Sequence, residues 1–306
     1  MIAIQIANIL HSNEARNLTP GTQSLYINAS YIKPRTLDEA VARLAAGNAH
    51  ILSGGTDFYP ALGDRVMPEA VVDVSGLREL RGVSCQADCF RIGGLTTWSE
   101  IIRTPLPRCF DALKSAAREV GSVQIQNRGT VAGNLCNASP AADGVPPLLA
   151  LDAEVELVSK AGVRKMPLTE FIVGNRKTQR KTDELLTAVL VPRGLENAAS
   201  AFAKLGARRY LVISISMVAA VVQIGDRRVL DARVAVGSCS AVARRLRALE
   251  SDLVGASARD GLGPLARLEH LAPLSPIDDV RATAEYRIDA SLRLVQRALN
   301  SCVENG

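Results

Sequence analysis

One segment of the sequence stands out, Asn127-Arg-Gly-Thr-Val-Ala-Gly-Asn-Leu-Cys-Asn-Ala-Ser-Pro-Ala-Ala-Asp143. It is rich in glycine, amide and hydroxyl residues, and its few apolar residues follow neither a helical nor a strand period. We therefore expect a loop here. Gly129 and Gly133 would allow positive φ angles and close backbone approach, and the hydroxyl and amide side chains can donate hydrogen bonds to phosphate oxygens. The segment favours a loop that binds a phosphate-bearing cofactor, with an ordered surface loop as the alternative.

A second glycine-rich segment, Ile51-Leu-Ser-Gly-Gly-Thr-Asp-Phe58, strengthens the cofactor interpretation. Its apolar start predicts a strand that leads into Gly54 and Gly55. A glycine turn after a strand is a common way to direct backbone amides at a phosphate group. The chain contains neither the G-x-G-x-x-G dinucleotide pattern nor the G-x-x-x-x-G-K-[ST] phosphate loop. The two segments therefore indicate a nucleotide site of a different kind.

Together the segments resemble the FAD-binding (medium) subunits of the molybdenum hydroxylases, the family of the flavoprotein subunits of xanthine dehydrogenase and carbon monoxide dehydrogenase. That family carries an Ala/Ser-Gly-Gly-Thr-Asp loop, matched by Ser53 to Asp57. It also carries Arg-Asn-x-Gly-Thr-x-Gly-Gly-Asn-x-x-x-Ser-Pro-x-x-Asp, matched between Asn127 and Asp143. The similarity extends from Tyr31 to about residue 300.

The chain departs from this pattern in two places. Ala132 replaces the first of the paired glycines, and a methyl group there disfavours positive φ and could alter a close contact. The order Asn127-Arg128 is the reverse of the family's, which leaves the roles of these two residues open.

The resemblance implies an α+β protein with a two-subdomain FAD-binding fold of the PCMH type, followed by a smaller α+β C-terminal domain. We expect an N-terminal extension at 1–30, FAD-binding subdomains at 31–89 and 90–198, and the C-terminal domain at 199–306.

By the same resemblance, the cofactor is FAD and the chain is the electron-transfer subunit of an oxidoreductase complex. A small partner subunit with [2Fe–2S] clusters and a large molybdopterin subunit are expected, with NAD, oxygen or another molecule as the acceptor. Two alternatives stay open. The chain could be a self-contained FAD-dependent oxidoreductase, although its three histidines offer little general-base chemistry, or a non-catalytic module with a decayed flavin site.

The resemblance also implies which residues bind FAD. Asp143 has a helix-capping role as its alternative, and Lys204, expected to reach the flavin ring or the acceptor, could be an ordinary surface lysine. No residue is assigned a catalytic or metal-binding role. The expected cofactor-binding residues are Leu52, Ser53, Gly54, Gly55, Thr56, Asp57, Phe58, Thr130, Gly133, Asn134, Ser139, Asp143 and Lys204.

Composition narrows the function classes. The chain has 306 residues, 47% of them hydrophobic and 22% charged, as in ordinary globular proteins of two or three domains. A net charge of +5 and an aromatic content of 4% do not indicate nucleic-acid binding. No apolar run is long enough to span a bilayer, so we expect a cytoplasmic protein. The six cysteines match no usual zinc or iron–sulfur spacing, so no cluster is expected in this chain.

Local patterns predict the main elements. Capping boxes at Thr36 and Thr97, each with a Glu three residues later, predict helix starts. We further expect helices over 110–120, 241–253 and 290–302, strands over 153–159 and 185–191, and a hairpin over 212–236 that turns at Gly225-Asp226. The basic segment Gly174-Asn-Arg-Lys-Thr-Gln-Arg-Lys181 is either solvated surface or a contact for a partner subunit or an anionic acceptor.

Overall fold

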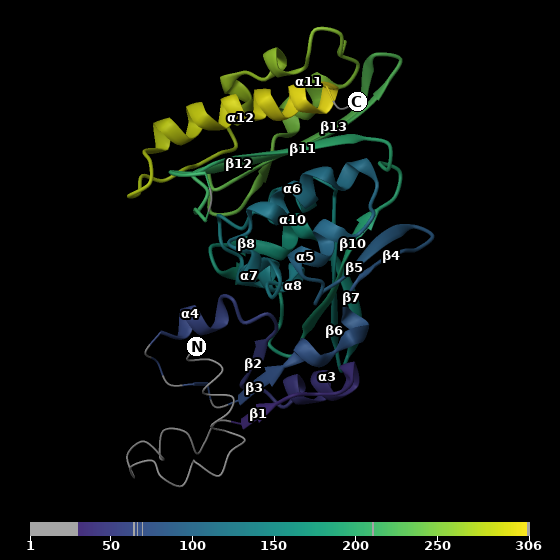
Figure 1. Ribbon diagram of the computed structural model, residues 1–306, viewed down its shortest axis with the longest axis vertical. Coiled ribbons are helices and arrows are strands. Elements are labelled where there is room, and N and C mark those ends of the chain that lie inside the picture. Colours follow the sequence, from purple (N-terminus) through teal and green to yellow (C-terminus); the bar gives the residue numbers. More distant parts are fainter. Residues whose placement is uncertain (1–29, 64, 66, 69, 210, 305–306) are drawn as a thin grey trace.

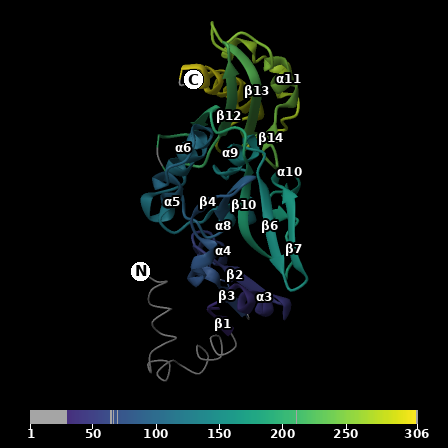
Figure 2. The same ribbon diagram turned by 90° about the vertical axis from the view of Figure 1, so that its right-hand side faces the viewer.

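Three larger β-sheets follow one another along the described part of the chain, and each forms a separate layer of an elongated molecule (Figures 1 and 2). A fourth, two-stranded sheet pairs β8 with β9. The computed structural model describes residues 30–304 except 64, 66, 69 and 210. The predicted α+β class is confirmed. The expected N-terminal extension lies outside the described residues except for Ser30, which begins strand β1. None of the helices in the described ranges combines the length and apolar character that a bilayer crossing requires.

The first sheet is parallel, with strand order β1-β3-β2. Its helix α3 is capped by Thr36, whose hydroxyl accepts from the Glu39 amide as predicted. The Glu39 carboxylate, however, accepts from the amide of Arg35 instead of Thr36, so the capping box is only half formed. The elements of this layer are β1 (Ser30–Ile32), α3 (Leu37–Ala45), β2 (Ala49–Leu52), α4 (Phe58–Leu62) and β3 (Ala70–Asp73).

The second sheet has five antiparallel strands in the order β4-β5-β10-β6-β7, with the buried strand β10 at its centre. The predicted capping box at Thr97 and Glu100 is present in full and starts α5. The elements of this layer are β4 (Val83–Cys85), β5 (Cys89–Gly93), α5 (Trp98–Arg103), α6 (Asp111–Glu119), α7 (Val123–Gln126), α8 (Val131–Asn137), α9 (Val145–Ala150), β6 (Glu154–Ser159), β7 (Gly162–Pro167), α10 (Leu168–Phe171), β8 (Ile172–Gly174), β9 (Lys177–Thr178) and β10 (Leu185–Pro192).

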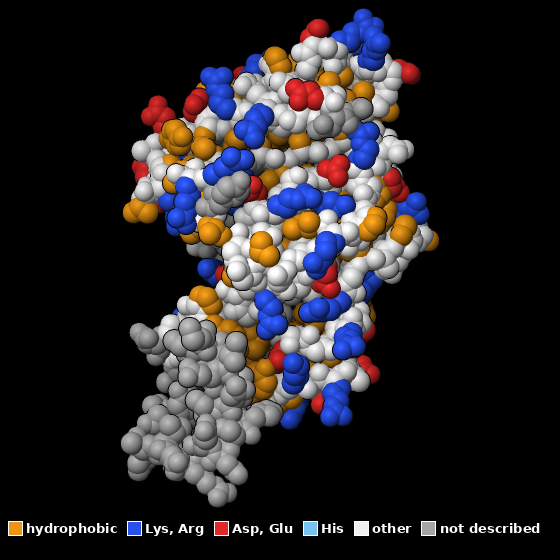
Figure 3. Space-filling model, viewed as in Figure 1, with side chains coloured by type: hydrophobic (Ala, Val, Ile, Leu, Met, Phe, Trp, Pro, Cys, Tyr) orange, Lys and Arg blue, Asp and Glu red, His pale blue; other side chains and the backbone are white. Residues whose placement is uncertain are grey.

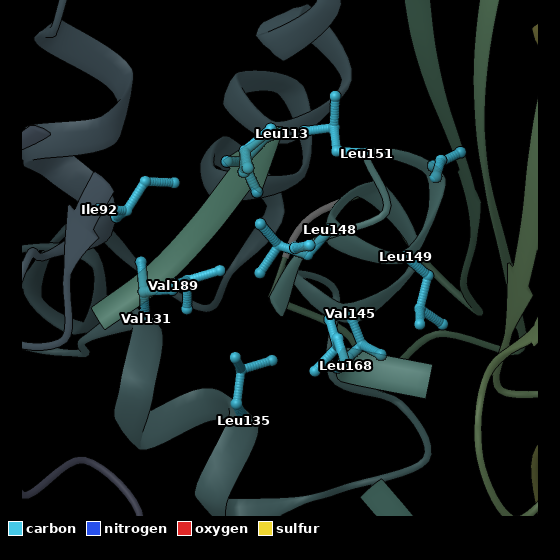
Figure 4. Packing of buried hydrophobic residues seen from close by; sticks show 14 of the residues in the cluster. Ile92, Leu113, Val131, Leu135, Val145, Leu148, Leu149, Leu151, Leu168 and Val189 are labelled. Atoms are coloured by element: carbon cyan, nitrogen blue, oxygen red, sulfur yellow. The ribbon is translucent and has the colours of Figure 1, made fainter. Parts of the chain in front are cut away.

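Apolar packing joins these two layers. Leu95 and Leu185 of the second layer belong to the same buried cluster as Leu44 and Val72 of the first. The main core lies between the five-stranded sheet and helices α5, α6, α8 and α9 (Figure 4). Because β4 pairs with β5, residues 83–85 belong to the second sheet. The subdomain division at 89/90 stays a prediction, although the sheets change between Asp73 and Val83.

The third sheet lies between two helical layers, with α12 and α11 on one face and α6 and α9 on the other (Figure 1). Its strand order is β11-β12-β13-β14. The apolar face of α12 packs on β11 and β12 through Val295, Leu299 and Cys302. The elements are β11 (Ala199–Leu205), β12 (Ser216–Gly225), β13 (Arg228–Gly237), β14 (Arg244–Arg245), α11 (Arg247–Leu253) and α12 (Ala284–Glu304).

The predicted hairpin turn of this domain and the predicted start of its strand β12 need correction. The hairpin turn is Asp226-Arg227, one residue later than expected, with φ of 49° and 60°. Two positive φ angles match the twist of the flanking strands. Strand β12 begins at Ser216, not near 212.

Both helices of this domain also begin elsewhere than predicted. Helix α11 starts at Arg247 rather than 241, because Arg244 and Arg245 pair with β13. Helix α12 starts at Ala284, six residues earlier than expected, because its first turns carry little of the apolar pattern used to find it.

On the face shown in Figure 3, Lys and Arg side chains lie scattered among Asp and Glu side chains.

A buried arginine, Arg245, joins the second and third layers. Its guanidinium donates to the Leu149 carbonyl and to Asp152, and it is paired with Glu250. This side chain is only 5% exposed, so its charge is matched almost entirely by protein groups.

Candidate functional site

A cleft of about 1070 Å³ opens between the first and second layers. Both glycine-rich segments line it, one from the end of β2 and the other from the start of α8. Apolar side chains contribute to its walls, among them Trp98, Val120 and Ile125. The cleft therefore combines glycine-rich backbone, hydroxyl groups and apolar side chains in one space.

Gly54 and Gly55 form the turn at the end of β2. Gly55 has φ of 75°, a conformation that favours glycine. Gly54 needs the absence of a side chain for another reason: an added Cβ would overlap the carbonyl oxygen of Arg128 and lie 2.8 Å from its carbon. The two glycine-rich segments thus touch through their backbones at this point.

The predicted loop over 127–143 is wrong in its central part, because Val131–Asn137 form helix α8. Thr130 caps the helix, and its hydroxyl accepts from the Gly133 amide at 3.0 Å. Buried Val131 and Leu135 have the spacing of one helix face and pack into the main core (Figure 4). This i, i+4 pair was the sequence signal for a helix, and the surrounding small and polar residues obscured it.

Gly129 and Gly133 do not have the positive φ angles that were expected. Glycine is needed at position 133 because a side chain there would have too little space. A Cβ on Gly133 would lie 2.8 Å from Thr130 Oγ1 and 3.2 Å from Ser53 Oγ. The Ser53 and Thr130 hydroxyls are themselves 3.3 Å apart. Glycine therefore lets α8 start directly against the first segment.

Ala132 is accommodated within α8, where positive φ is not required. Its amide donates to the Gly94 carbonyl at 3.0 Å. A Cβ on Gly94 would come within 3.2 Å of the Ala132 methyl, so the space that alanine takes lies opposite a glycine. In the reversed Asn127-Arg128 pair, Asn127 accepts from Ser99 and Arg128 meets Gly54 through its carbonyl.

Nine of the predicted binding residues line the cleft and four do not. Leu52 is buried in the protein, and Ser139 accepts from the Ala141 amide in the turn after α8. Asp143 and Lys204 form a buried pair between the second and third layers. The nine lining residues are Ser53, Gly54, Gly55, Thr56, Asp57, Phe58, Thr130, Gly133 and Asn134.

The Asp143–Lys204 pair is an internal contact of the protein. Lys204 Nζ lies 2.7 Å from Asp143, which also accepts from the Ser214 hydroxyl at 2.7 Å. Burial raises the pKa of Asp143, and the Lys204 ammonium and the Ser214 hydroxyl act in the opposite direction. Asp143 does not cap α9, because the N-cap residue of that helix is Gly144.

Several lining residues were not among the predicted ones. The basic hairpin formed by β8 and β9 brings Arg176, Lys177 and Arg180 to the cleft. The basic composition of this segment was the available signal, but its position next to α8 depends on long-range folding. Cys136 also lines the cleft, and burial raises the pKa of its thiol to about 11, so the thiol stays protonated at neutral pH.

The donor set suits a dinucleotide. The Gly54-Gly55 turn, the Ser53 and Thr130 hydroxyls and three cations from the β8–β9 region all line the same cleft, with the two hydroxyls 3.3 Å apart. In addition, Asn134 Oδ1 is buried without a hydrogen-bond partner among the described residues. Such a group is expected to bind a ligand or ordered water. These observations fit a phosphate-bearing cofactor with an extended aromatic part.

Comparison with known proteins agrees with this geometry. Residues 26–194 match the family described as FAD binding domain in molybdopterin dehydrogenase, and residues 201–302 match the CO dehydrogenase flavoprotein C-terminal domain. The chain belongs to the FAD-binding subunits of the molybdopterin dehydrogenases. Its cofactor is FAD, and it is an oxidoreductase subunit of the xanthine dehydrogenase and CO dehydrogenase type.

Individual relatives have the same character. The chain is 39% identical over 193 residues to the nicotinate dehydrogenase FAD-subunit of Eubacterium barkeri, a match covering 60% of this chain and 65% of that one. It is 32% identical over 278 residues to the caffeine dehydrogenase subunit beta of Pseudomonas sp. (strain CBB1), covering 88% and 92%. The crystal structure of quinoline 2-oxidoreductase from Pseudomonas putida 86 superimposes with a TM-score of 0.83 at 26% identity, covering 90% and 97%.

The contact between the two glycine-rich segments can be tested with Gly54→Ala. Because the added methyl group meets backbone atoms of Arg128, the segments must separate, and we expect FAD to bind at least ~10-fold more weakly, equivalent to about 1.4 kcal/mol. Flavin fluorescence titration measures this. Gly76→Ala is the control, since Gly76 does not line the cleft and its Cβ would come closest, at 3.2 Å, to the flexible Lys33 side chain. Wild-type affinity in Gly54→Ala would contradict the role of this contact.

The buried ion pair leads to a stability prediction for Lys204→Met. The variant leaves the Asp143 carboxylate buried without its cation, which should lower the free energy of unfolding by about 3–5 kcal/mol. Urea denaturation gives the value. Lys33→Met is the control, because Lys33 is 56% exposed and pairs with Asp73 at 3.5 Å, and such pairs contribute less than about 1 kcal/mol. Equal stability of the two variants would show that the pair is not a stabilising contact.

Proposed function

We propose that this subunit holds FAD in the cleft between its first two layers and passes electrons from a partner subunit to a final acceptor. The observation that carries the proposal is the direct contact of the two glycine-rich segments at Gly54 and Arg128. It brings the donors of both segments together at one point of a cleft of about 1070 Å³.

The residues of the two segments would hold the diphosphate. Gly54, Gly55 and Thr56 offer backbone amides where β2 ends, and Thr130 offers its hydroxyl from the start of α8. The Gly133 amide is already bonded to Thr130, so its part is to leave room for the cofactor. Asn134 would give its unpaired side-chain oxygen a partner.

Other lining residues would determine how the cofactor lies. The Asp57 carboxylate can accept from hydroxyl groups of the sugar or ribityl chain. Phe58 and Ile125 provide apolar surface for the aromatic ends, and the buried Trp98 lies behind them in the cleft wall. When bound, FAD supplies the capacity to accept and release electrons one or two at a time. The protein contributes position and electrostatics.

The subunit would act within a larger complex. We propose a small partner subunit with two [2Fe–2S] clusters as the electron donor and a large molybdopterin subunit as the site of substrate oxidation. NAD, oxygen or another molecule would take the electrons. The names of the relatives support a complex of several subunits, since the caffeine dehydrogenase protein is a subunit beta and the carbon monoxide dehydrogenase protein of Hydrogenophaga pseudoflava is a medium chain.

The test begins with the purified chain and FAD. We expect uptake of about one FAD per chain, followed by rapid flavin bleaching when a separately purified, dithionite-reduced iron–sulfur subunit is added without oxygen. The absorption of the iron–sulfur clusters should recover at the same rate. The FAD-free chain is the control and should leave the clusters reduced. A folded chain that takes up no FAD, even with its partners present, would contradict the proposal. Reduction of the isolated holo-chain by an organic substrate would favour a self-contained enzyme.

A further inference from the structure

The basic hairpin β8–β9 carries positive charge that the glycine-rich segments lack. Of the residues lining the cleft, the Lys and Arg side chains are those of Arg176, Lys177 and Arg180. The two glycine-rich segments contribute one charged residue to the lining, Asp57, which is negative. A cofactor diphosphate bound by those segments alone would therefore meet donors but no countercharge.

The hairpin is fixed against the C-terminal end of α8. The Arg176 amide donates to the Ala138 carbonyl at 2.9 Å, and its guanidinium donates to Asn137 Oδ1. Arg176 holds φ of 58°, which is unfavourable for a non-glycine residue and persists only where surrounding contacts impose it. These contacts fix the positions of Lys177 and Arg180, the next two cations along the chain that line the cleft.

The three cations differ in how far the protein already uses them. Arg176 is bonded to Asn137. Arg180 donates to the Lys181 and Glu184 carbonyls, each at 2.8 Å. The ammonium group of Lys177 makes no hydrogen bond or ion pair with any other residue in the described part of the chain, although this residue lines the cleft. Lys177 is therefore the cation of this hairpin that remains available to a ligand.

We propose that Lys177 neutralises the diphosphate of FAD, a role that rests on the proposed function above. Helix α8 has seven residues, so it separates the hairpin from the Gly54 contact by about 10 Å at ~1.5 Å per residue. The flexible four-carbon stem of lysine can cover part of that distance along the cleft wall. Lys177 thus supplies the countercharge, and the two glycine-rich segments supply the hydrogen bonds.

The experiment compares Lys177→Met with Lys181→Met by fluorescence titration of the purified chain. Lys181 belongs to the same basic segment but does not line the cleft. We expect Lys177→Met to weaken FAD binding about 10-fold, with a reduced dependence on salt, because one screened charge interaction is lost. Riboflavin, which has no phosphate, should bind both variants and the wild type equally. Far-UV circular dichroism should show the same fold in all three.

Three results would overturn the proposal. Lys177→Met could bind FAD as tightly as Lys181→Met, or lose riboflavin as strongly as FAD. It could also keep its FAD affinity and instead raise the KM for the acceptor in the assembled complex, which would assign the hairpin to acceptor binding. A wild-type chain that takes up no FAD would be a different result, because it would remove the proposed function itself.

Discussion

The architecture of the site depends on a backbone contact that tolerates no side chain. Gly54, at the end of β2, lies so close to the Arg128 carbonyl that any Cβ would overlap it. The first segment is held by a parallel sheet and the second by α8, whose Val131 and Leu135 are fixed in the main core. Two separately stabilised elements therefore meet at one glycine. The cleft exists because the layers are joined there while the space beside the contact stays open.

The third layer stabilises the second segment from behind. Lys204 and Ser214 hold Asp143, and the Ser238 amide donates to the Pro140 carbonyl at 3.0 Å. These contacts fix the turn that follows α8, although none of them reaches the cleft. A domain with no part in the cleft wall thus contributes to the precision of the site. Asp143, the last residue of the second glycine-rich segment, therefore has a structural role through its contacts with Lys204 and Ser214.

Much of the fold and of the candidate site could be predicted from the sequence, and the predictions that were wrong or incomplete share a cause. Helix starts at Thr36 and Thr97 were found because capping is local chemistry. The family and its FAD cofactor followed from two short segments. By contrast, the position of Asp143 depends on Lys204, which lies 61 residues further along the chain. The basic hairpin reaches the cleft only because Arg176 binds the end of α8. Contacts of this kind depend on the complete fold, and local patterns do not encode them.

The most direct test of the account is a crystal structure of the chain with FAD bound. We predict that the diphosphate lies in the cleft, within hydrogen-bonding distance of the Gly54-Gly55 turn and of Thr130, where the two segments meet. An FAD molecule bound elsewhere, or one whose diphosphate contacts only one of the two segments, would contradict the central claim that their meeting point forms the site.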